Sequence, residues 1–159
     1  MKWVAPEGIH LTLKFLGNIP QSKIPEIVAG TTKASQGIPP FTLETSDLGA
    51  FPNLRRPSVF WLGIDGNMEK VCTLQKRIDD ELKPMGFVPE KRAFTPHLTL
   101  ARIRETASLQ NRNDFGNLVS RTHFCSKNVI EVKGINLIRS QLQPTGAVYS
   151  RLAEVDLRG

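Results

Sequence analysis

The chain has 159 residues, a net charge of +6 at pH 7 and 40% hydrophobic residues, which is typical of one globular domain over residues 1–159 that buries a core without disulfide bonds. No apolar run approaches the roughly 18 residues that cross a bilayer, and residues 1–6 lack the apolar core of a secretory signal. We therefore expect a cytoplasmic protein with no membrane partner. The basic charge favours polyanionic partners such as nucleic acid, although mildly basic domains without such a partner are also common.

Segments typical of strands and of helices alternate along the chain. The strand-like segments are rich in β-branched or aromatic residues and are bounded by Gly, Pro and Asn. They are residues 9–16, 41–48, 59–64, 94–103, 128–132, 135–142 and 148–157. The last two are expected to form a hairpin across Pro144, Thr145 and Gly146. Together with the helices below, these strands predict a mixed α+β domain.

The clearest helix signal covers residues 67–86. Asn67 is a candidate N-cap, Gly86 is a candidate C-terminal stop, and Pro84 helps to end the helix. Apolar residues between them recur every three or four positions, as on one face of a helix. These residues are Val71, Leu74, Ile78 and Leu82.

Two further segments have weaker helical patterns. Residues 22–35 carry Pro25 in the expected first turn, and residues 108–121 are expected to form a helix that Gly116 interrupts. Cys72 and Cys125 fit neither a disulfide framework nor a metal-binding CxxC motif, so we expect both to be buried as small apolar side chains.

The tetrapeptide HLTL occurs twice, at residues 10–13 and 97–100. In a strand, the histidine and threonine of each copy project from one face and the leucines project from the other. The two polar pairs are His10 with Thr12 and His97 with Thr99. If two similar halves of the domain face each other, these pairs would meet across a cleft with pseudo-twofold symmetry.

An imidazole beside a hydroxyl is a candidate catalytic pair, although a single buried histidine is more often a structural residue. The duplication favours catalysis, whereas His123 lacks the following threonine and is interpreted as structural. Hydrolysis of a cyclic phosphodiester needs a base that takes a proton from water and an acid that protonates the leaving ribose oxygen. Histidine performs either role near neutral pH, and hydroxyl groups stabilise charge on the phosphate oxygens. Because no third ligand clusters with the histidines, a metal site is disfavoured and no cofactor is expected.

The two H-x-T segments, preceded by WVAP (residues 3–6) and by FTP (residues 94–96), resemble the 2H phosphoesterase superfamily. HLTLKFLG, LGAFPNLRRPSVFWLGI and FTPHLTLAR are more closely similar to bacterial and archaeal RNA 2′,3′-cyclic phosphodiesterases, also described as 2′-5′ RNA ligase-like proteins. The resemblance covers nearly the whole chain. It implies an α+β fold with two antiparallel-rich sheets, in pseudo-symmetric lobes around a central cleft, and helices on the outside.

The resemblance also implies an activity. RNA with 2′,3′-cyclic phosphate ends, or cyclic nucleotides, would be hydrolysed to 2′-phosphomonoesters without a metal ion, and the same site would join RNA ends. His10 would donate a proton to the leaving oxygen and His97 would accept one from water, while Thr12 and Thr99 hold the phosphate. The alternative is a non-catalytic module that binds RNA ends and has a degenerate N-terminal lobe.

Arg102 matches an arginine of this family that helps to bind phosphate. Simple alternation along a strand places Arg102 on the opposite face from His97. A β-bulge or the end of the strand must therefore reorient Arg102 if it binds phosphate.

Four further side chains are candidates for nucleotide contacts, with an aromatic ring stacking on a base. They are Lys14, Arg92, Phe94 and Tyr149. Lys14 shares a strand face with His10, but a solvated lysine is the alternative, and for Phe94 packing in the core is the favoured alternative. Arg55 and Arg56 lie in a loop bounded by prolines, where they either guide RNA or form a solvated turn.

Members of this family usually begin with a strand and a helix before the segment that matches residues 1–4. Either the natural chain starts upstream of Met1, or the N-terminal half lacks these two elements. In the second case, we expect an open sheet edge and uncovered apolar surface. We expect a monomer, with self-association through the short N-terminal lobe as the alternative.

Overall fold

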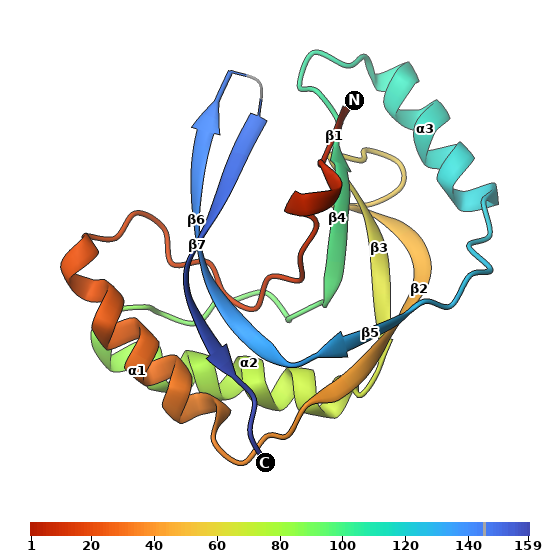
Figure 1. Cartoon of the computed structure of the whole chain (residues 1–159). Helices are drawn as coiled ribbons and strands as arrows, with labels where there is room; N and C mark the ends of the chain where they lie inside the picture. Colours follow the sequence, from red (N-terminus) through yellow and green to blue (C-terminus); the bar gives the residue numbers. More distant parts are fainter. Residues whose placement is uncertain (145) are drawn as a thin grey trace. The chain divides into compact units, whose positions relative to one another are not determined.

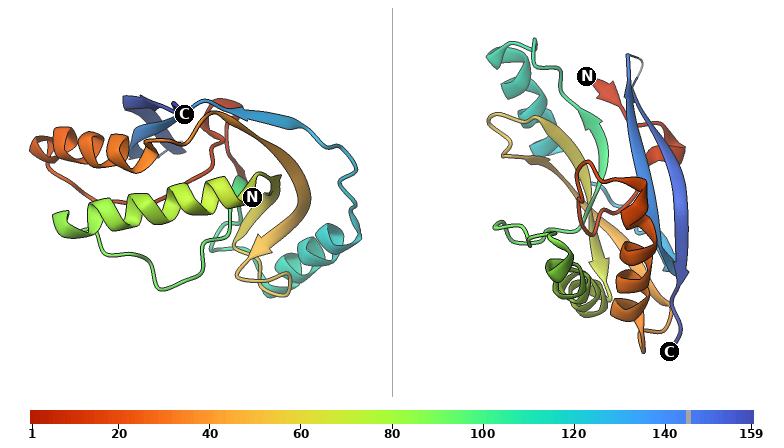
Figure 2. Two further views of the ribbon diagram at one scale, coloured as in Figure 1. Left: turned by 90° about the horizontal axis from the view of Figure 1, so that it is seen from below. Right: turned by 90° about the vertical axis from the view of Figure 1, so that its left-hand side faces the viewer.

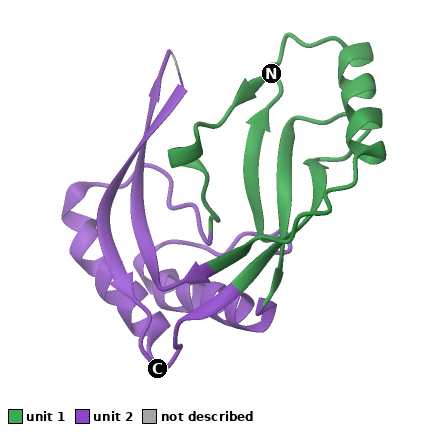
Figure 3. Ribbon diagram, turned by 45° about the vertical axis from the view of Figure 1, so that its right-hand side comes forward, with its two compact units in different colours: residues 1–12, 43–66, 95–130 green, residues 13–42, 67–94, 131–159 purple. Residues whose placement is uncertain are grey.

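The computed structural model describes residues 1–144 and 146–159, and its elements divide between two compact units (Figures 1 and 3). Unit 1 comprises residues 1–12, 43–66 and 95–130, and unit 2 comprises residues 13–42, 67–94 and 131–159. The described residues form a five-stranded sheet, a two-stranded sheet and three α-helices, which confirms the predicted α+β class. Among these residues, no helix is both long and apolar enough to cross a membrane.

The five-stranded sheet is the main element of unit 1, although one end of β2 and one end of β5 belong to unit 2. Its strands in spatial order are β1 (Lys2–Trp3), β4 (His97–Arg102), β3 (Val59–Gly66), β2 (Phe41–Phe51) and β5 (Val129–Val132). β4 pairs antiparallel with both β1 and β3, and β3 pairs antiparallel with β2. The strands β2 to β5 lie at segments predicted from their β-branched and aromatic residues, whereas β1 lies outside the predicted segments.

The core of unit 1 lies between one face of this sheet and α3 (Leu109–Arg121). Phe60 of β3, Ala101 of β4 and Val119 of α3 form one buried cluster. The ring of Phe60 also meets that of Phe115 edge to face, with the centroids 5.3 Å apart. Burial of this apolar surface, which contributes about 25 cal/mol per Å², holds the helix against the sheet.

The predicted interruption of this helix at Gly116 is wrong, because α3 runs through it. Ser108 caps the helix, since its hydroxyl oxygen accepts a hydrogen bond from the amide of Asn111 at 3.1 Å. Gly116 is buried against the loop between β2 and β3, where a Cβ atom would overlap the carbonyl oxygen of Leu54. Close packing therefore explains the glycine, and it outweighs a helix-propensity cost of about 1 kcal/mol.

Unit 2 contains α1, α2 and the two-stranded sheet. The elements are α1 (Ile24–Ser35), α2 (Met68–Leu82), β6 (Gly134–Gln143) and β7 (Gly146–Asp156). α1 and α2 lie side by side, and α1 also contacts β7 (Figure 2). Antiparallel pairing of Gln143 with Gly146 confirms the predicted hairpin. Thr145, which was predicted as part of the connection, lies outside the described residues.

The apolar stripe predicted for α2 is buried along its whole length. Its members are Val71, Leu74, Ile78 and Leu82. Gly30 of α1 lets the two helices approach, because a Cβ atom there would lie 3.0 Å from side-chain atoms of Leu82 and Met85. After a 3₁₀ turn (η3, Lys83–Met85), Gly86 adopts the left-handed conformation (φ 96°), as its predicted role as a C-terminal stop requires.

The prediction of a strand over residues 9–16 is wrong. A 3₁₀ turn (η1, Pro6–Gly8) precedes this segment, and Leu11 alone pairs, through an isolated bridge to Leu98. After Thr12 the chain leaves unit 1 for unit 2. Of the alternating residues 9–16, only Leu11 therefore has a partner on a neighbouring strand.

The prediction that both cysteines are buried is also wrong. Cys72 and Cys125 are free and exposed. Cys72 directly follows Val71 and so lies about 100° around α2 from the buried stripe. Cys125 lies in the irregular segment between α3 and β5.

Candidate active site

The two H-x-T segments lie together within unit 1. Leu11 and Leu98, the first leucines of the two HLTL copies, form an antiparallel bridge. In an antiparallel register, the residues on either side of a bridged pair face each other across the strands. Extended by one residue from the Leu11–Leu98 bridge, this register would set His10 against Thr99 and Thr12 against His97. In β4, alternation places His97 and Thr99 on one face and Leu98 on the other.

The two histidines make the same local hydrogen bond. Nδ1 of His10 lies 2.7 Å from the carbonyl oxygen of Gly8, and Nδ1 of His97 lies 2.7 Å from that of Thr95. A carbonyl oxygen only accepts hydrogen bonds, so Nδ1 of each neutral ring carries the hydrogen and Nε2 carries the lone pair. Each imidazole is thus held in one tautomer by the residue two positions before it.

Two aromatic side chains flank His97. The ring of Phe51 meets the imidazole at 80° with the centroids 4.8 Å apart, and the ring of Trp61 lies at 6.2 Å. Phe51 and Trp61 also contact each other at 5.2 Å. Gly49, which faces Trp61 across β2 and β3, leaves room for the indole, because a Cβ atom there would overlap it. The orientation of His97 is therefore supported by packing as well as by its hydrogen bond.

Neither Phe51 nor Trp61 was predicted as a site residue. Both lie in the segment LGAFPNLRRPSVFWLGI, which carries part of the family resemblance. The signal that places them beside His97 is the register of three strands, in which Phe51 faces Val59 and Trp61 faces Thr99. One sequence does not reveal this register.

β4 contains a bulge at Leu100. The neighbouring cross-strand pairs are Phe60 with Ala101 and Trp61 with Thr99. Leu100 is thus an extra residue without a partner in β3. Both Leu100 and Ala101 contact the buried cluster beneath α3, and Ala101 is 0% exposed. Two successive side chains therefore point toward the core.

The bulge turns Arg102 onto the face that carries His97 and Thr99. Arg102 faces Val59, which shares that face with Trp61 two residues further along β3. The arginine side chain is exposed. Simple alternation thus misplaces Arg102, and the bulge supplies the reorientation that a phosphate-binding role requires.

The four predicted nucleotide contacts belong to unit 2, and their roles stay predictions. The ammonium group of Lys14 pairs with the carboxylate of Asp79 and donates to the carbonyl oxygen of Val88 at 3.2 Å. The Lys14 side chain is only 5% exposed, so it is not the solvated lysine of the alternative interpretation. The other three are Arg92 and Phe94, in the loop before β4, and Tyr149 in β7.

The loop between β2 and β3 is organised by Asn53. Its side-chain oxygen accepts hydrogen bonds from the amides of Arg55 and Arg56, each at 3.0 Å. Arg55 also lines a hollow in unit 1 together with Gly49 and Trp61. A role for the two arginines in guiding RNA stays a prediction.

The two H-x-T segments, joined by the Leu11–Leu98 bridge, and Arg102 of β4 bring two imidazoles, two hydroxyls and a guanidinium together in unit 1. Imidazoles transfer protons, while hydroxyls and a guanidinium donate hydrogen bonds to anionic oxygens. Within residues 1–144 and 146–159, no group of three or more His, Cys, Asp or Glu side chains is placed to hold a metal ion. The arrangement therefore suits acid–base chemistry at a phosphate group.

This combination of fold and site defines a phosphoesterase, and the comparison with known families agrees. The sequence profile of the family described as LigT like Phosphoesterase matches residues 1–61 and 62–149. The chain belongs to this family, which confirms the family that the H-x-T motifs predicted.

Several curated relatives are named RNA 2′,3′-cyclic phosphodiesterase. The relative from Methanothermobacter thermautotrophicus is 35% identical over 150 residues, covering 94% of this chain and 79% of the relative. The relative from Aeropyrum pernix is 36% identical over 155 residues, covering 98% of this chain and 85% of the relative. The similarity therefore extends over most of both sequences.

Solved structures agree with the fold. A Thermus thermophilus protein matches with a TM-score of 0.80 and 29% identity, over 99% of this chain and 82% of that protein. E. coli LigT, crystallised in complex with 3′-AMP, matches with a TM-score of 0.76 and 25% identity, over 99% of this chain and 81% of that chain.

Proposed function

We propose that this chain hydrolyses 2′,3′-cyclic phosphate ends of RNA and leaves a 2′-phosphomonoester beside a free 3′-hydroxyl group. The observation that carries this proposal is the Leu11–Leu98 bridge, which joins two distant H-x-T segments in one register. Relatives named RNA 2′,3′-cyclic phosphodiesterase support the same reaction. The net charge of +6 favours a polyanionic substrate such as RNA.

The two histidines share the proton transfers of the reaction. Nε2 of His97 takes a proton from water as the water oxygen attacks phosphorus. The bond between phosphorus and O3′ breaks, and the protonated Nε2 of His10 gives its proton to the departing O3′. Exchange with solvent then returns both imidazoles to their starting states. Thr12 and Thr99 donate hydrogen bonds to the non-bridging oxygens, and Arg102 adds a charged, bidentate donor.

The same groups would join two RNA ends. A 5′-hydroxyl group takes the place of water, loses its proton to His97 and attacks the cyclic phosphate, while O3′ leaves with the proton of His10. The product is a 2′–5′ phosphodiester. Water competes with the 5′-hydroxyl for the same position. The experiment below therefore measures hydrolysis, with no 5′-hydroxyl RNA added.

Hydrolysis is expected to proceed at the same rate in excess EDTA as without it, because the proposed acid, base and phosphate donors are all side chains. The assay uses an oligoribonucleotide with a 2′,3′-cyclic phosphate end, and chromatography against 2′- and 3′-phosphate standards identifies the product. A rate that EDTA abolishes and Zn²⁺ or Mn²⁺ restores would contradict the mechanism. Binding of the RNA end without turnover would support the non-catalytic module instead.

A further inference from the structure

Lys2 stands directly opposite Arg102 at an edge of the five-stranded sheet. The register of β1 and β4 pairs Lys2 with Arg102 and Trp3 with Ala101. Residues that face each other across two antiparallel strands project from the same face of the sheet. Because the bulge in β4 puts Arg102 on the face that carries His97, Lys2 lies on that face as well.

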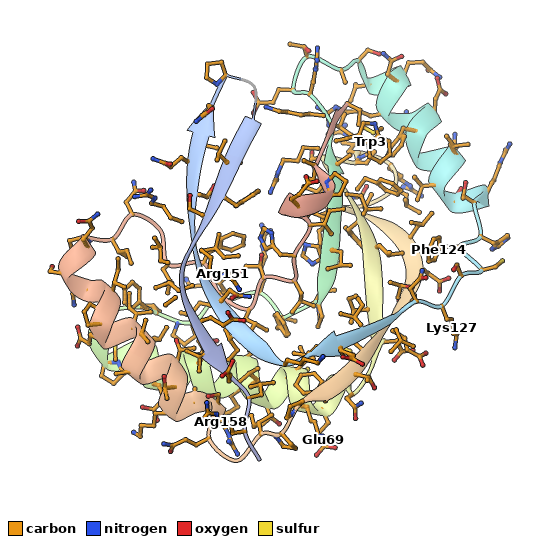
Figure 4. The ribbon with its side chains drawn as sticks, viewed as in Figure 1. Trp3, Glu69, Phe124, Lys127, Arg151 and Arg158 are labelled. Carbon is orange, nitrogen blue, oxygen red and sulfur yellow. The ribbon has the colours of Figure 1, made fainter. Side chains whose placement is uncertain are left out.

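Trp3 and Val4 hold β1 in this register. The ring of Trp3, labelled in Figure 4, meets that of Phe60 at 84° on the core face, with the centroids 6.1 Å apart. The amide of Val4 donates a hydrogen bond to the carbonyl oxygen of Leu100 at 2.9 Å. Lys2 therefore projects from an anchored strand, and its direction is set by the pleat.

Lys2 and Arg102 place two positive charges side by side. Like charges directly opposite each other in a sheet are destabilising. In the described part of the chain, neither side chain forms an ion pair with a carboxylate. An anion bound at this position would relieve the repulsion. In an RNA substrate, the nearest anion to the terminal phosphate is the adjoining phosphodiester group.

We propose that Lys2 binds the phosphodiester group that links the terminal nucleotide to the preceding nucleotide of the RNA. The inference rests on the proposed function, in which the H-x-T pairs and Arg102 hold the terminal phosphate. Lys2 lies about 4.5–5.5 Å from Arg102 between Cα atoms, so the second anion site directly adjoins the first. A lysine binds phosphate as a point charge and suits a backbone contact that carries no base specificity. The favoured substrate is therefore an RNA chain rather than a cyclic mononucleotide.

The test compares the binding of two product-like ligands by isothermal titration calorimetry at several salt concentrations. One is 2′-AMP, and the other is the dinucleotide ApA with a 2′-phosphate end, which adds one phosphodiester. For the unmodified protein, the salt dependence of log Kd should be steeper for the dinucleotide by about 0.7, the single-strand value for one phosphate contact. Lys2→Gln should abolish this difference and weaken dinucleotide binding about 3–10-fold, with 2′-AMP binding unchanged.

Lys127→Gln is the matched control, because it removes the same charge from unit 1. Lys127 lies in the segment before β5 (Figure 4), and β5 and β1 are the two opposite edges of the sheet. It should change neither affinity, and Lys2→Arg should keep the preference for the dinucleotide. If Lys2→Gln weakens the binding of both ligands equally, Lys2 contacts the terminal phosphate and the proposal is wrong. If Lys2→Gln leaves dinucleotide binding unchanged, the proposal is also wrong. Since the readout is binding, a protein that binds both ligands as expected but hydrolyses no cyclic phosphate would contradict only the proposed function.

Discussion

Replacing either H-x-T histidine with alanine is expected to slow cyclic phosphate hydrolysis by about 10²–10⁴-fold, because each change removes one proton transfer from the transition state. The double variant His10→Ala/His97→Ala should fall little below the single variants, since groups that act in one transition state are not additive. Initial rates on an oligoribonucleotide with a cyclic phosphate end measure the effect. The rate of the unmodified protein should rise and then fall with pH, because one imidazole must be neutral while the other is protonated.

His123→Ala is the matched control for these variants. His123 is exposed in unit 1, follows α3 and has no threonine two positions later, so its removal should leave the rate unchanged. Thermal melts are needed alongside the rates, because His97 packs against Phe51 and Trp61 and its loss also removes contacts. A folded His10→Ala or His97→Ala protein with near-normal turnover would show that the duplicated HLTL is structural.

The placement of His97 and Thr99 on one face of β4 was accessible from sequence because it depends on a local rule. The side-chain period of two places the histidine and threonine of the strand-forming copy on one face, whichever strand lies beside it. The pairing of the copies was a hypothesis from their duplication, and the Leu11–Leu98 bridge supplies the contact between them. The failure of residues 9–16 to form a strand could not be foreseen from the sequence, because a strand also needs a hydrogen-bonding partner along its length.

The position of Arg102 depends on one residue of register and could not be derived from alternation. A shift of one residue moves every later side chain of a strand to the other face. The extra residue, Leu100, is an ordinary apolar strand residue and carries no mark of a bulge in the sequence. The same limit applies to Phe51 and Trp61, whose contacts with His97 follow from pairing among β2, β3 and β4.

Local propensity failed where a tertiary contact decides the outcome. Gly116 weakens an isolated helix, but the adjacent carbonyl of Leu54 leaves no room for a side chain and α3 continues through it. Cys72 lies beside a buried position of α2 and is nevertheless exposed. For Gly116, the deciding neighbour lies far away in the sequence.

Arg102→Ala is expected to lower kcat/KM for a cyclic phosphate end by about 10²–10³-fold, the usual loss when one donor to a developing oxyanion is removed. Arg102→Lys should recover only part of this loss, because a lysine ammonium cannot form the two parallel hydrogen bonds of a guanidinium. Kinetics on the cyclic mononucleotide isolate the effect at the terminal phosphate, since that ligand lacks the phosphodiester assigned to Lys2.

Arg104→Lys is the matched control, because Arg104 is an exposed arginine two residues further along and lies beyond the end of β4. It should leave the kinetics unchanged. Arg102 directly follows the fully buried Ala101, so melting temperatures must be compared to separate a lost phosphate contact from a disturbed bulge. If Arg102→Lys is stable and fully active, positive charge alone suffices and the bidentate contact is wrong. If Arg102→Ala is also fully active, the bulge at Leu100 serves the packing of Leu100 and Ala101 beneath α3 and does not serve the site.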